Sequence, residues 1–189
     1  MKSKKHPVTK IALLFALMIP LVIIVEIFGR KKGMVGELYS VFGAPFVEEA
    51  FKALILAFVA LAMVLVGHKQ LERLGSKLAW FAGGFAIGLI FGLYENLEGY
   101  SFSAERIVPT FNHAVWTGLV GMGIYFYMRL RMPLKLLRLY LAAVGAHAIW
   151  NFGAFLLEKE SDLGFGVCGV ASWTLVMGVT IAAWRKNMR

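Results

Sequence analysis

The sequence predicts an all-α, polytopic integral membrane protein, a helical bundle of about six transmembrane helices. Of its 189 residues, 59% are hydrophobic and only 16% are charged, and the mean hydropathy is +0.71. A soluble domain has no use for so much apolar surface. The apolar runs are continuous rather than alternating, which argues against a β-barrel. The length suits one transmembrane domain, residues 1–189, without a second soluble domain.

Six apolar segments follow one another along the chain, each close to the roughly 20 residues that a spanning helix needs. Their approximate ranges are 9–28, 41–66, 78–97, 108–128, 134–157 and 163–184. The second segment is long, and Gly43-Ala44-Pro45 predicts an interfacial turn near its start. Pro109 and Pro133 fall at or near helix starts, where a missing N–H is tolerated.

The basic residues orient these segments. With six spans, 14 of the 20 lysines and arginines lie on the face that holds both termini, and five lie on the other face. Because cytoplasmic loops carry an excess of Lys and Arg, both termini are expected in the cytoplasm of a multi-pass protein of the cell membrane. The same residues sit in short loops beside the apolar runs, so the net charge of +9 indicates a lipid bilayer and not a nucleic acid as partner.

Ionisable residues inside the apolar segments predict a functional site. A charge in hydrocarbon costs at least ~2.5–3.5 kcal/mol, so such residues usually face a protein interior or a wet cavity. They are Glu48, Glu49, Lys52, Glu95, His113 and His147. From the chain direction and a rise of about 1.5 Å per residue, the acids and histidines fall within roughly 4–15 Å of the outer boundary. A depth shared by four segments favours one common site.

Each of these residues also has a purely structural interpretation. Glu48 and Lys52 share a helical face at i, i+4, which suits either a carboxylate that activates water or an ion pair that orients the helix. Glu95 either joins the site or reaches toward the interface. An intramembrane histidine is often an interhelical hydrogen-bonding group. Asn151, at i+4 from His147, can orient an imidazole or donate to an oxyanion.

Charge raises the question of a metal. Three carboxylates and one lysine give a net charge of −2 with neutral histidines, which a shared cavity relieves by protonating a glutamate or by holding a divalent cation. Zinc accepts His and Glu ligands, but the sequence contains no HExxH motif. We expect no cofactor, with zinc as the alternative. The possible metal ligands are Glu48, Glu49, Glu95, His113 and His147.

Four motifs in this order resemble the PrsW family of intramembrane endopeptidases, within the wider group that includes the CAAX prenyl proteases. They are EEAFK at 48–52, GLIFGLYEN at 88–96, HAVW at 113–116 and HAIWN at 147–151. These stretches lie in four of the six segments, about positions 48–151, and the first and last segments carry nothing recognisable. The glycines at 84, 88 and 92 are in themselves most typical of close helix packing.

The resemblance implies a hydrolase of the glutamic type. Glu48 would be the general base that polarises water, with Glu49 beside it, and His147 with Asn151 would stabilise the oxyanion, as in the HxxxN pattern of the CAAX proteases. Those relatives carry FxxxH where this chain has Phe91 followed by Glu95, so His113 is the candidate to orient the water. Supporting positions are Lys52, which stands one residue before the corresponding arginine, and also Phe91, Glu95 and Asn96.

The leading hypothesis is therefore an intramembrane endopeptidase. The resemblance implies that it cuts a membrane-anchored protein, such as an anti-sigma factor, near the extracytoplasmic surface. A proton- or cation-coupled transporter is the first alternative, since Glu and His chains also relay protons. It would need a polar path through the inner half of the bilayer, where such residues are sparse. A non-enzymatic scaffold that binds a partner helix through the glycine strip is the second alternative.

Overall fold

The computed structural model describes residues 34–66, 76–98 and 106–185, and the predicted span 9–28 lies outside this part. Every element within it is helical, which confirms the predicted helical membrane bundle. The elements are α2 (Met34–Leu38), the π-helix η1 (Tyr39–Gly43), α3 (Ala44–Val66), α5 (Lys77–Glu98), α6 (Ile107–Leu130), α7 (Pro133–Glu158) and α8 (Asp162–Arg185).

Helices α5 to α8 begin and end within two residues of the ranges read from hydropathy. Pro133 opens α7 at a position where its missing N–H leaves no helical bond unmade. Between α6 and α7 the chain turns at Arg131, which has a positive φ of 57° and whose N–H donates to the carbonyls of Phe126 and Tyr127. Short turns of this kind make consecutive helices antiparallel neighbours.

The predicted turn at Gly43-Ala44-Pro45 is wrong, because α2, η1 and α3 form one continuous helical segment. The Ala44 N–H donates to the Tyr39 carbonyl, five residues earlier, so this turn is wider than an α turn. Pro45 has no N–H with which to continue the α ladder, and a single π turn before it shifts the bonding register without ending the helix. The helical segment that α2 and η1 add before α3 carries Glu37 and Ser40.

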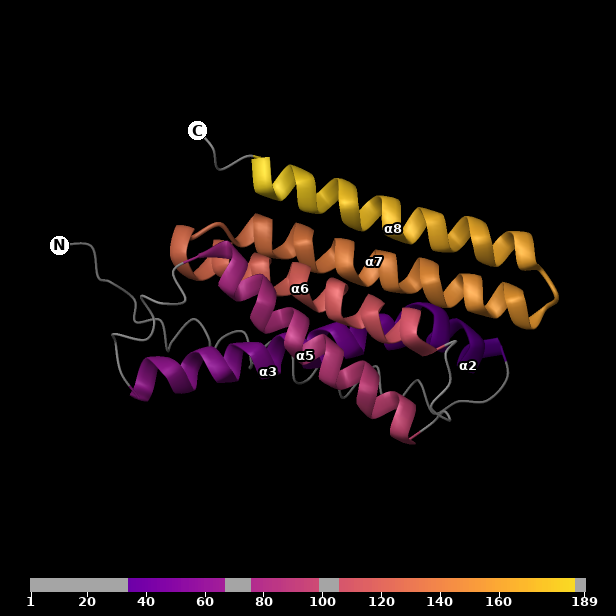
Figure 1. Ribbon diagram of the computed structural model, residues 1–189, viewed down its shortest axis with the longest axis horizontal. Coiled ribbons are helices and arrows are strands. Elements are labelled where there is room, and N and C mark those ends of the chain that lie inside the picture. Colours follow the sequence, from indigo (N-terminus) through magenta and orange to yellow (C-terminus); the bar gives the residue numbers. More distant parts are fainter. Residues whose placement is uncertain (1–33, 67–75, 99–105, 186–189) are drawn as a thin grey trace.

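The helices pack mainly with their neighbours in sequence, α5 on α6, α6 on α7 and α7 on α8. Figure 1 shows α6, α7 and α8 side by side, with α8 at the edge. Helix α3 contacts α5, α6 and α7. The buried apolar core lies among these helices and includes Leu56, Leu119, Met122, Phe126 and Ala143. Polar residues on α3 therefore point to the place where three other helices converge.

At its glycines, the backbone of helix α5 lies in close contact with the backbone of α6. A Cβ atom added to Gly84 or Gly88 would collide with the carbonyl of Thr117 or His113, respectively. At Gly92 it would come within 2.9 Å of the Cα atom of Thr110. The strip of small residues thus lets α5 lie against the face of α6 that carries these three polar residues.

Three helices of the described part, α5, α7 and α8, are long and apolar enough to cross a membrane. The two other long helices, α3 and α6, carry four of the ionisable residues expected in the site, Glu48, Glu49, Lys52 and His113. In α6, His113 is buried inside the bundle. The protein is thus a membrane protein whose polar groups face its own interior.

Candidate functional site

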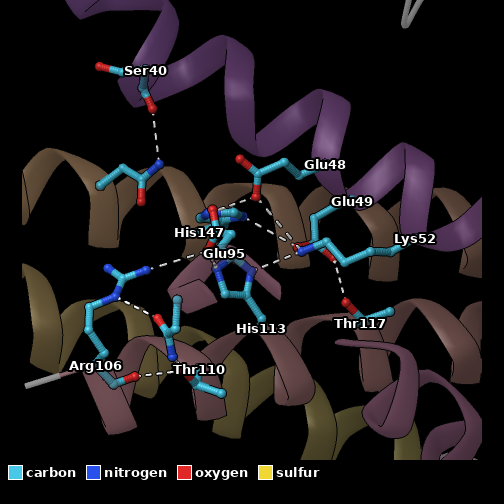
Figure 2. Close-up of polar contacts among 12 residues, drawn as sticks. Ser40, Glu48, Glu49, Lys52, Glu95, Arg106, Thr110, His113, Thr117 and His147 are labelled. Atoms are coloured by element: carbon cyan, nitrogen blue, oxygen red, sulfur yellow. Dashed lines mark hydrogen bonds and ion pairs between the residues drawn. The ribbon is translucent and has the colours of Figure 1, made fainter. Parts of the chain in front are cut away.

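Lys52 lies at the centre of a buried cluster of charges (Figure 2). Its ammonium nitrogen is 2.6 Å from Glu49 Oε1, 2.9 Å from His113 Nδ1 and 4.0 Å from Glu48 Oε2. The side chains of Lys52 and Glu49 are both 0% exposed. Burial of the two ions is tolerable because each charge is paired and hydrogen-bonded.

Glu49 connects three helices. Besides Lys52 on its own helix, it accepts a hydrogen bond at Oε2 from the Thr117 hydroxyl of α6 at 3.1 Å. Its Oε1 lies 3.3 Å from His147 Nδ1 of α7. This fully buried carboxylate thus links α3 to α6 and α7.

His113 is fixed at both ring nitrogens. Because an ammonium group only donates, Nδ1 accepts from Lys52, and the ring proton lies on Nε2. From Nε2 it is donated to Glu95 Oε2, 2.8 Å away. The Phe91 ring packs beside His113 and Lys52. Its centre lies 5.4 Å from that of the His113 ring and 4.4 Å from the Lys52 ammonium nitrogen.

His147 is oriented by stacking. Its ring lies 4.3 Å from the Trp116 ring at an interplanar angle of 19°, and it is nearly perpendicular to the His113 ring at 4.9 Å. With Nδ1 toward Glu49, the other nitrogen, Nε2, lies 3.8 Å from Glu48 Oε2. Glu48 and the two histidines therefore converge from α3, α6 and α7.

A polar network surrounds the far side of Glu95 (Figure 2). Arg106 Nη2 is 3.6 Å from Glu95 Oε2, and Arg106 Nε donates to Asn96 Oδ1 at 2.8 Å. Asn96 Nδ2 donates to Thr110 Oγ1 at 2.8 Å, and this hydroxyl donates to the Arg106 carbonyl at 2.7 Å. Asn96 is buried, and it is bonded to Arg106 and Thr110.

A pocket of about 310 Å³ opens onto the cluster. Among its lining residues are Glu48, Glu95, Arg106, His113, Trp116, His147 and Asn151, with Glu37, Ser40 and Glu158. Glu49 and Lys52 lie behind this wall and do not line it. Asn151 borders the pocket one turn after His147, and its amide nitrogen donates to the Ser40 carbonyl at 2.9 Å.

The sequence prediction did not single out Arg106, Thr110 or Ser40. A signal for the first two exists, because Arg106, Thr110, His113 and Thr117 follow at i, i+4, i+7 and i+11 and so share one face of an otherwise apolar helix. Ser40 gives no such signal, since its contact with Asn151 uses a backbone carbonyl that any residue provides.

The donor set suits a divalent metal. Glu48, His113 and His147 each offer a ligand atom, and these atoms lie within 4.8 Å of one another. Two histidines and one carboxylate form a donor set of catalytic zinc sites. The Glu49 carboxylate lies 3.3 Å from His147 Nδ1, on the side where metal-bound histidines usually have a carboxylate. His113 would exchange its present hydrogen bond to Glu95 for the ion.

A comparison with known families decides the class of protein. The family described as PrsW family intramembrane metalloprotease matches residues 8–183. The chain belongs to the PrsW family. The match includes the first and last predicted segments, where the motifs gave no resemblance. No curated protein and no solved structure matches the chain. Membership makes this an intramembrane protease and a hydrolase, and it does not support the transporter or scaffold hypotheses.

The expectation of no cofactor is wrong. The PrsW family is described as one of metalloproteases, and Glu48, His113 and His147 form a possible metal-binding group. The sequence alone does not show this metal-binding group, because its three residues belong to different helices and lie far apart in the chain. Only the packing of α3, α6 and α7 brings them together.

Proposed function

We propose that this PrsW-family protease hydrolyses a peptide bond of a membrane-anchored protein, of the anti-sigma-factor type, close to the extracytoplasmic surface. The observation that carries the proposal is a single pocket lined by a possible metal group, a further carboxylate and an amide donor. The distribution of basic residues supports cytoplasmic termini and a site in the outer half of the membrane.

Glu48, His113 and His147 would hold the metal, with zinc favoured by the donor chemistry. A bound ion of this kind acts as a Lewis acid and makes water a nucleophile at neutral pH. Glu49 and Trp116 keep the His147 ring in its present orientation through the 3.3 Å contact and the stacking. Glu49 is thus a positioning residue and not a group that touches substrate.

Glu95 would be the general base. Once Glu48 serves as a ligand, Glu95 is the carboxylate of the cluster that still faces the pocket, with 27% of its side chain exposed. It takes a proton from water as the water oxygen bonds to the scissile carbonyl carbon. The proton then goes to the amine that leaves when the C–N bond breaks. A positioned base contributes about 10²–10⁴-fold to the rate.

Asn151 would donate to the oxyanion that forms on the scissile carbonyl. Its amide borders the pocket beside His147 and now donates to the Ser40 carbonyl. A bound substrate carbonyl would take over this donor. Loss of one such donor lowers kcat by about 10²–10³-fold.

Two glutamine variants separate the two carboxylates. In liposomes with a single-span substrate, Glu95→Gln should lower kcat by about 10²–10⁴-fold while the protein keeps its metal. Glu48→Gln should lose both cleavage and bound metal. Glu160→Gln, at an exposed turn between α7 and α8, is the matched control. Mass spectrometry of the fragments locates the cut.

Full activity of Glu95→Gln would remove the base assignment. Wild-type metal content in Glu48→Gln would remove this glutamate from the metal group. A cut on the cytoplasmic side would contradict the proposed orientation.

A further inference from the structure

We infer that Arg106 is a positioning residue for catalysis, which acts by holding the Glu95 carboxylate at the wall of the pocket. The inference rests on the proposed function, in which Glu95 accepts the proton of the attacking water. Arg106 was expected only as a loop cation that helps to fix topology. Its contacts assign it a more specific task.

Arg106 is tied down at both its side chain and its backbone. Asn96 accepts from the Arg106 Nε–H, and Thr110 donates to the Arg106 carbonyl. Asn96 and Thr110 are in turn bonded to each other at 2.8 Å. These three bonds close a ring of contacts between the end of α5 and the start of α6. The guanidinium is therefore pre-oriented before any substrate binds.

This fixed guanidinium faces Glu95. Glu95 Oε2 lies between Arg106 Nη2, at 3.6 Å, and His113 Nε2, at 2.8 Å. The Glu95 side chain is partly exposed, near an end of α5 where Tyr94 and Leu97 are exposed as well. A glutamate in such a place has several rotamers open to it. The Arg106 cation selects the rotamer in which the carboxylate lies at the pocket wall.

The role predicts a defined kinetic effect. Arg106→Gln removes the cation and keeps much of the side-chain volume, so kcat should fall by about 10–100-fold, as for other groups that orient a reacting side chain. KM and the bound metal should stay at wild-type values, because Arg106 contacts neither substrate nor the metal group in this role. Arg138→Gln, on an exposed part of α7, is the matched control.

A double-mutant cycle decides whether the effect passes through Glu95. In the Glu95→Gln background, Arg106→Gln should cause no further loss of kcat, because the group that it positions is already gone. An equal loss in both backgrounds, or a rise in KM with unchanged kcat, would overturn the inference and indicate a direct contact with substrate. Loss of metal from Arg106→Gln would overturn it too.

A second pair of variants serves if Arg106→Gln does not fold. Thr110→Val deletes the hydroxyl that joins Asn96 to the Arg106 backbone, and Thr110→Ser keeps it. The valine variant should lose kcat several-fold and the serine variant should not. Equal kcat in the two variants would overturn the inference.

Failure of the proposed function is visible separately. If Glu95→Gln alone keeps full kcat, the base assignment fails. The unfolding temperatures of the wild type, Arg106→Gln, Glu95→Gln and the double variant then test the contact between Arg106 and Glu95. Non-additive shifts support the positioning contact, and additive shifts overturn it.

Discussion

Lys52 is the residue that holds the buried charges together. It is fully buried, contacts Glu49 and His113 directly, and lies near Glu48. Breaking a buried pair by removing one partner is far more harmful than never having had the pair, because the remaining charge stays in a medium that solvates it poorly. The stability of the whole site should therefore depend on this one ammonium group.

Lys52→Met tests this dependence. The change keeps an unbranched side chain but leaves the Glu49 carboxylate without its closest cation, so we expect a loss of about 3–5 kcal/mol in the free energy of unfolding. Denaturant unfolding in mixed micelles measures the loss. Glu49→Gln added to the same protein should recover part of it, because the uncompensated charge disappears. A Lys52→Met protein as stable as the wild type would refute this role.

The residues of this cluster are easier to find in the sequence than their surroundings are. Ionisable residues inside apolar runs stand out in the sequence, so Glu48, Lys52 and the two histidines could be found from the sequence alone. The different surroundings of Glu48 and Glu49 could not. The two are adjacent in sequence, yet one lines the pocket and the other is sealed behind it. Which of two neighbours faces a cavity depends on where other helices pack.

At the scale of helices, the contact between α5 and α6 positions the site. The glycine strip of α5 lies against the backbone of Thr110, His113 and Thr117. These residues supply, in order, the anchor of Arg106, a possible metal ligand and a partner of Glu49. A displacement of α5 from α6 would thus change the geometry of the whole cluster.

Gly88→Ala tests the close approach directly. The added methyl group would meet the His113 carbonyl, so the two helices must separate, and we expect a cost of about 1–3 kcal/mol with reduced cleavage. Gly83→Ala is a matched control in the same helix, because its Cβ would meet only a Leu56 methyl group at 3.5 Å. Thermal unfolding and the cleavage assay compare the two. Equal behaviour of both alanine variants would contradict the role of the strip.

The helices themselves were easier to predict than their pairing. Long apolar runs bounded by charged loops give the limits of α5 to α8 to within two residues. The π turn before Pro45 was missed, because Gly-Ala-Pro is a common turn sequence and only the surrounding helix contacts keep the segment continuous. The convergence of α3 with α5, α6 and α7 has no signature in any one segment.

At the scale of the whole molecule, the bundle separates water from lipid. Apolar side chains cover its outside, including those of Ile90, Leu163 and Val170. The polar residues of four helices line one pocket or lie just behind it. A peptide bond needs water and a stabilised oxyanion to be cut, and both are excluded from hydrocarbon. The gathering of Glu48, Glu95, His113 and His147 at one pocket would let a membrane protein perform hydrolysis there.

The metal content of the purified protein, measured together with cleavage by the same samples, tests the proposed mechanism most directly. A metal-assisted site made of Glu48, His113 and His147 predicts about one divalent ion per chain, as in other catalytic metal sites with one ion. Chelation should then stop cleavage, and return of the ion should restore it. His147→Ala should purify with little metal. Undiminished cleavage by protein that holds no ion would contradict the mechanism.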